Sequence, residues 1–165
     1  MTSASGRPDL RRIGQSAFLE VLSVLLSLPA TVQNPSSHAD LSNAPDQVTS
    51  MVPLAGQRLS GRVHLQLPLA FVARAVWILT GLDHAEGEAN GVLEDTAGEL
   101  SNMVAGRVAV QLAADGYPCT LGTPSVSRNV TLPMETELGM DFGRIDLFCD
   151  GHWLSLELKC RYAIP

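Results

Sequence analysis

The chain has 165 residues, a length that suits one domain with a sizeable hydrophobic core. Seventeen acidic and eleven basic residues give a net charge of -6. Six of the acids fall between Ala75 and Gly106, a stretch without lysine or arginine, so the rest of the chain is neutral. Because no basic stripe is present, the composition argues against binding to nucleic acid or to an anionic membrane.

The cysteines and histidines show no metal-binding or disulfide pattern. Three cysteines are scattered over the second half of the chain, and the four histidines lie far apart. This usage is typical of small core cysteines in a reducing compartment. We therefore expect a cytoplasmic protein with no cofactor or metal of its own.

Residues 1–9 are predicted to form a loose tail, and residues 10–165 a single domain. A helix is expected over residues 11–28, because large apolar residues recur at helical spacing and Pro29 ends the run. The same run follows two arginines and resembles a secretory signal, which would make the protein an exported one. Glu20 lies inside the run and favours an amphipathic helix, which is also too short to span a membrane.

The remaining elements follow from periodicity and turn residues. In chain order they are a polar, flexible loop over 33–47, strands over 51–54 and 62–67, a helix over 69–80, an acidic loop over 82–91, a helix over 94–114, and strands over 119–121, 125–132, 144–149 and 152–164. Asp150-Gly151 joins the last two strands and is a strong hairpin signal. Together they predict an α+β fold, a mostly antiparallel sheet packed against helices.

The helix expected over residues 94–114 has one polar face. At about 100° per residue, four of its residues share an arc of about 60°: Asp95, Glu99, Asn102 and Gly106. The apolar residues lie on the other side and are expected to face the core. A glycine inside a helix is unfavourable by about 1 kcal/mol relative to alanine, so close approach of another backbone would account for it.

Glu99 and Asn102 are neighbours on the surface of this helix. An Asn amide orients a water molecule without titrating, and a Glu pairs with a cation, which suits water placement in phosphoryl transfer. A structural alternative is favoured by the spacing alone. Thr96-x-x-Glu99 fits a capping box, in which case Thr96 is the N-cap and Asp95 lies outside the helix.

The segment 95–106, DTAGELSNMVAG, resembles the signature helix of the CheX/CheC family of chemotaxis phosphatases. That family carries a Glu-x-x-Asn motif, with Asp or Ser one turn before the Glu and a Pro well beyond the Asn. Here Asp95 precedes Glu99 by four residues, and Pro124 follows Asn102. The single motif resembles CheX more than the two-site CheC arrangement, and a weaker match covers residues 52–65. Relative to the family that it resembles, the chain has an apparent insertion, the polar loop over 33–47.

The resemblance implies a CheX-like fold and a phosphatase acting on a phosphorylated CheY-type response regulator. By that resemblance, Asn102 would position the attacking water and Glu99 would pair with the partner's active-site lysine, with Asp95 and Gly106 facing the partner. The partner would hold the Mg²⁺, and the protein would form a homodimer. A non-enzymatic regulatory or scaffold domain of the same fold is the alternative.

Overall fold

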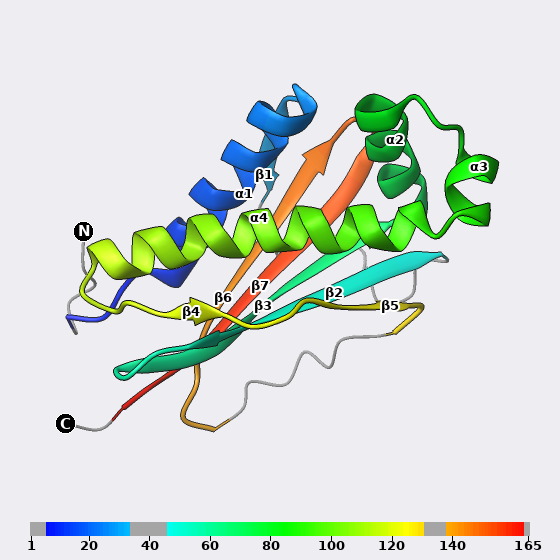
Figure 1. Cartoon of the computed structure of the whole chain (residues 1–165). Helices are drawn as coiled ribbons and strands as arrows, with labels where there is room; N and C mark the ends of the chain where they lie inside the picture. The colour runs from blue at the N-terminus through cyan, green and yellow to red at the C-terminus, as the bar shows by residue number, and fades with distance from the viewer. Residues whose placement is uncertain (1–5, 34–45, 131–137, 164–165) are drawn as a thin grey trace.

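The computed structural model describes residues 6–33, 46–130 and 138–163. In these residues, one antiparallel sheet of seven strands carries helices on one of its faces (Figure 1). The helices are α1 (Leu10–Leu26), α2 (Leu69–Thr80), α3 (His84–Ala89) and α4 (Val92–Ala114). The strands are β1 (Ala30–Gln33), β2 (Gln47–Ala55), β3 (Leu59–Pro68), β4 (Thr120–Leu121), β5 (Ser125–Arg128), β6 (Asp141–Cys149) and β7 (His152–Tyr162). The predicted α+β fold is confirmed.

Two long hairpins form the centre of the sheet. The strands follow the order β1-β6-β7-β3-β2-β4, and β5 pairs with β2. The β6–β7 hairpin turns at Asp150 and Gly151, whose φ angles of 49° and 80° both lie in the left-handed region. Positive φ at both central residues is the requirement of a type I′ turn, so the Asp-Gly signal predicted this hairpin correctly.

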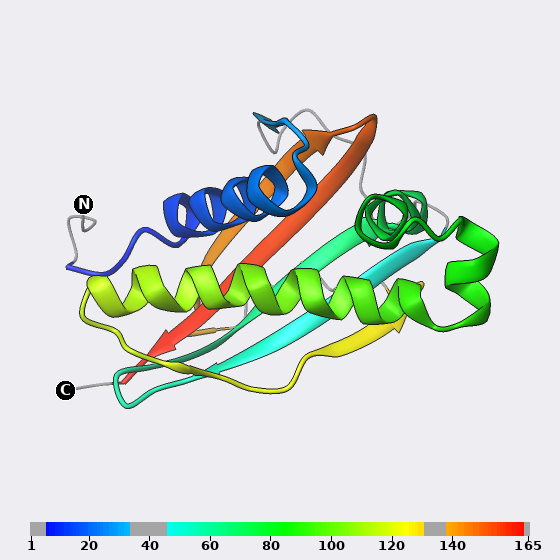
Figure 2. The ribbon, with the colours of Figure 1, turned by 45° about the horizontal axis from the view of Figure 1, so that its top comes forward.

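The core lies between the helices and one face of the sheet. Alternate residues of the central strands are fully buried on that face, among them Val63, Leu65, Ile145, Leu147, Leu156 and Leu158. Helix α4 runs along the sheet beside α1, with α2 and α3 near its N-terminal end (Figure 2). No helix of the described segments is long and apolar enough to cross a membrane.

Several element boundaries differ from those predicted. Helix α1 ends at Leu26 rather than residue 28, because Ser27 takes the left-handed conformation (φ 54°). Strand β1 was not predicted, since its four residues carry no clear alternation. Helix α3 lies inside the predicted 82–91 loop, where the Asp83 and Glu86 side chains each accept a hydrogen bond from the other residue's backbone N–H and form a capping box.

Parts of the predicted tail and loop can be described. Asp9 caps α1, and Arg7 forms an ion pair with Asp141 at 3.1 Å, so these residues contact the domain. The predicted 33–47 loop begins and ends in strands, because Gln33 closes β1 and Gln47 opens β2. Its positions 34–45, like residues 1–5, 131–132 and 164, lie outside the described residues.

Candidate functional site

Helix α4 begins earlier than its sequence suggested. Its first residue is Val92 and its N-cap is Gly91, which has a φ of 70°. Thr96 is therefore the fifth residue of the helix, and it is buried rather than placed at the N-terminus. The Thr96-x-x-Glu99 capping box is wrong, and Asp95 belongs to the helix as the alternative interpretation required.

The buried side of α4 fixes the rotation of the helix. Leu100, Val104 and Val108 are buried in the core, as the sequence predicted. Next to them, the hydroxyl of Ser101 makes a short hydrogen bond with the hydroxyl of Ser50 on β2. This polar contact in the interior ties one turn of α4 to the sheet. The opposite side of the same turn is therefore presented to solvent.

The exposed side carries what we call the α4 stripe: Asp95, Glu99, Asn102, Met103, Gly106 and Val110. The three polar members are exposed. Glu99 and Asn102 lie three residues apart, which makes them surface neighbours. Within the described part of the chain, no side-chain hydrogen bond or ion pair occupies Glu99 or Asn102. Both groups are therefore available to another molecule.

Two apolar members of the α4 stripe were not predicted from the sequence. Met103 is 39% exposed and Val110 is 64% exposed, and both fall within about 80° of Asp95 on the helix circumference. Helical spacing alone would have placed them on this side. They extend the stripe beyond the motif and give it an apolar second half.

Gly106 lies in the middle of this stripe. A Cβ atom built on Gly106 would meet no atom within 4 Å, so no described segment of the chain accounts for the absence of a side chain. The close approach that the sequence suggested is therefore not made within the described protein.

Two of the six acids between Ala75 and Gly106 are bonded by an arginine from a distant segment. Arg128 on β5 donates two hydrogen bonds to Glu88, at 2.7 and 2.8 Å, and one to Glu94. The hydrogen bonds from Arg128 lower the pKa of Glu88, and the two carboxylates raise the pKa of Arg128. With Asp83 and Glu86 capping α3, Asp95 and Glu99 are left without such contacts among the described residues.

The chemistry available on the α4 stripe is that of positioning. Its exposed face carries carboxylates and an amide, whereas the two hydroxyl-bearing residues of α4, Thr96 and Ser101, are buried. In the described segments, no group of three or more His, Cys, Asp or Glu side chains is arranged to hold a metal ion.

A comparison with known families decides the relationship. The family model described as "Chemotaxis phosphatase CheX" matches residues 48–147, which is more than half of the chain and includes the whole of α4. The chain belongs to the CheX family. None of the curated proteins compared with it matches.

Solved structures show the same CheX fold. The chemotaxis protein CheX from Vibrio vulnificus has a TM-score of 0.77 at 17% identity, covering 93% of this chain and 97% of that one. A CheC-like superfamily protein from Shewanella gives 0.73 at 19% identity, covering 93% and 97%. A CheX–CheY–BeF3–Mg²⁺ complex from Borrelia burgdorferi gives 0.68 at 16% identity, covering 94% and 99%. At these identities the likeness establishes the fold.

Proposed function

We propose that this CheX-family protein dephosphorylates a CheY-type response regulator that carries a phosphoryl group on an aspartate. The observation that carries the proposal is the pairing of Glu99 and Asn102, which are exposed, adjacent and not bonded by other described side chains, on a helix whose opposite side is buried in the core. The family description supports the reaction class. The solved complex of a CheX with a CheY supports the class of partner.

Each residue of the pair has a separate role in this proposal. Asn102 holds the attacking water in line with the phosphorus, since its amide both accepts and donates hydrogen bonds and stays neutral. Glu99 forms an ion pair with the active-site lysine of the partner. Asp95 and Gly106 lie on the docking surface, and the missing side chain of Gly106 lets the partner backbone approach α4.

Catalysis would come from orientation rather than from a covalent intermediate on this chain. Placing a water at the reacting centre replaces a bimolecular encounter by a positioned one, which lowers the entropic part of the barrier. The partner supplies the Mg²⁺ that neutralises charge on the phosphoryl group, so α4 needs no metal ligand. We also propose that the protein works as a homodimer in the cytoplasm, where it meets its regulator.

The test is phosphate release from response regulators of the same host, each charged with a small acyl phosphate. The proposal predicts that the wild-type protein accelerates release well above the spontaneous rate and that Asn102→Ala does not. Release at the spontaneous rate, with binding of the regulator retained, would instead support the scaffold alternative. Equal acceleration by Asn102→Ala would contradict the catalytic role of that residue.

A further inference from the structure

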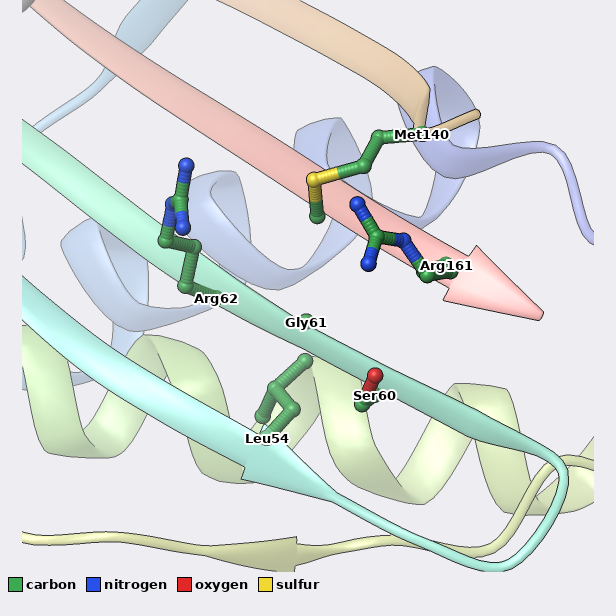
Figure 3. Close-up of a pocket in the computed structure, with 6 residues that line it drawn as sticks. All are labelled: Leu54, Ser60, Gly61, Arg62, Met140 and Arg161. Atoms are coloured by element: carbon green, nitrogen blue, oxygen red, sulfur yellow. The ribbon is translucent and has the colours of Figure 1, made fainter. Parts of the chain in front are cut away.

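A pocket of about 240 Å³ opens on the sheet face that points away from the helices. It lies over the ends of β3 and β7 and is lined by Leu54, Ser60, Gly61, Arg62, Met140 and Arg161. Figure 3 shows the side chains of Arg62, Met140 and Arg161 gathered on this side of the sheet, with helix α4 behind it. The pocket is thus separated from the α4 stripe by the sheet itself.

The strand register brings the polar groups of this pocket together. Ser60 pairs with Arg161 across the β3–β7 ladder, and Arg62 pairs with Lys159 two residues along. Residues on one face at such diagonal positions lie about 7–8 Å apart, so the long side chains of Arg62 and Arg161 can reach one small ligand. The Arg62 residue also interacts with another group within the protein. In the described segments, the Ser60 and Arg161 side chains make no hydrogen bond or ion pair.

The described lining of the pocket carries two arginines and no acidic residue, although the whole chain is negative. Lys159, which pairs with Arg62 across the ladder, is 5% exposed and forms an ion pair with Glu157 at 3.7 Å. His64 lies on the same face of β3 as Arg62, and the nearby positive charges affect its pKa. Burial lowers the pKa of His64, and the charges of Arg62 and Lys159 lower it further, to about 4. A ligand in this pocket would therefore be an anion.

We propose that this pocket binds a small phosphate-bearing dianion. A guanidinium presents paired N–H donors that match two oxygens of a phosphate, and the Ser60 hydroxyl supplies a further donor. The volume lies below the range of about 300–1,000 Å³ that is typical for drug-sized ligands. Inorganic phosphate or a short phosphorylated compound fits it, and a nucleotide does not. This site goes beyond the proposed phosphatase function and does not depend on it.

Isothermal titration of the full chain with inorganic phosphate and pyrophosphate, in chloride buffers of matched ionic strength, tests the proposal. We expect saturable binding at one site. Arg161→Gln should weaken it by at least about tenfold, the usual contribution of hydrogen bonds to a charged group. Arg107→Gln on α4 removes the same charge from another exposed arginine and should leave binding unchanged.

Absence of saturable binding, or equal binding of phosphate by Arg161→Gln, would overturn the proposal. Equal weakening by Arg107→Gln would also overturn it, because it would indicate general charge attraction. Malonate in place of phosphate tests the ligand class, and equally tight malonate binding would contradict a phosphate site. Thermal unfolding confirms that Arg161→Gln is folded. Asn102→Ala should bind phosphate like the wild type, so the failure of this site and of the phosphatase assignment can be told apart.

Discussion

Two glycines show how differently the same residue type is used in this molecule. A Cβ on Gly143 would lie 2.9 Å from backbone atoms of Leu10 and Arg11, whereas a Cβ on Gly106 would meet nothing. We predict that Gly143→Ala destabilises the fold by about 1–3 kcal/mol, because the start of α1 has to move away from β6. Gly106→Ala should stabilise it by up to about 1 kcal/mol through helix propensity.

Urea unfolding of both variants measures these free energies. Binding of a beryllofluoride-charged regulator by Gly106→Ala adds a second test, since the extra methyl group should weaken docking on α4 while the protein becomes more stable. A Gly106→Ala variant that docks as tightly as the wild type would remove the proposed reason for glycine at this position.

The charge of Glu99 is also predicted to act at the interface. Glu99→Lys places a cation opposite the partner's lysine, so we expect regulator binding to weaken by at least about tenfold. Glu20→Lys on α1 is the matched control, because Glu20 is exposed and makes an ion pair with Arg107 at 3.3 Å. Fluorescence titration with a labelled, beryllofluoride-charged regulator measures the affinity of each variant. Equal affinities for the two variants would contradict the role of Glu99.

At the scale of the element, Arg128 joins three segments of the chain. Its hydrogen bonds from β5 to Glu88 on α3 and Glu94 on α4 hold the start of α4 in place. These pairs are partly exposed, so screening by water and salt keeps the contribution of each one small. We predict that Arg128→Gln slightly lowers the free energy of unfolding at low salt.

Salt distinguishes this electrostatic contribution from a packing defect. In about 1 M NaCl the Debye length falls to about 3 Å, so the difference between Arg128→Gln and the wild type should shrink. Urea unfolding at both salt concentrations measures it, with Arg107→Gln as a control that loses one exposed ion pair. A loss of stability that is independent of salt would show that Arg128 acts by packing instead.

The elements that the sequence predicted are those with a strong local signal. Strand β7 and the Asp150-Gly151 turn depend on neighbouring residues, and both were confirmed. Strand β1 was missed because its strand character depends on pairing with β6. The Arg128 contacts were missed because they join residues 34 and 40 positions apart. The polar face of α4 was predicted from spacing, whereas its true start at Val92 depends on Gly91 and the preceding helix.

At the scale of the whole molecule, the charge is less concentrated than the sequence suggested. Arg128 offsets two of the six acids near α4, and the opposite face of the sheet carries Arg62 and Arg161 beside its pocket. The α4 stripe still exposes Asp95 and Glu99, whereas the phosphorylated pocket of the proposed partner would itself be anionic. The proposed function therefore requires docking by specific pairing and shape, with little help from long-range attraction.

The burial of His64, on the sheet face that points away from the helices, predicts how stability depends on pH. His64 has a pKa of about 4 in the folded protein against 6.5 for an ordinary histidine. The unfolded chain therefore binds a proton at higher pH than the folded one, so stability falls as the pH drops from 6.5 to 4. We expect this contribution to be on the order of 2 kcal/mol.

The raised pKa of Glu157 acts in the opposite sense, so the two contributions need to be separated. His64→Gln removes the titrating imidazole and leaves Glu157 in place. The difference between the unfolding free energies of the wild type and of this variant therefore isolates the contribution of His64. Urea unfolding at intervals between pH 4 and 7 should show a steeper loss for the wild type than for His64→Gln. Parallel curves would contradict the burial of a neutral His64.

The central claim is that Asn102 on an exposed, rigid helix positions the attacking water. Its most direct measurement is the dephosphorylation rate of the charged regulator at saturating protein, together with the affinity of the complex. We predict that Asn102→Ala lowers the maximal rate by at least about 100-fold, the scale of loss for a misplaced reacting group, while the affinity stays nearly the same. An unchanged maximal rate, or a loss confined to affinity, would contradict the account.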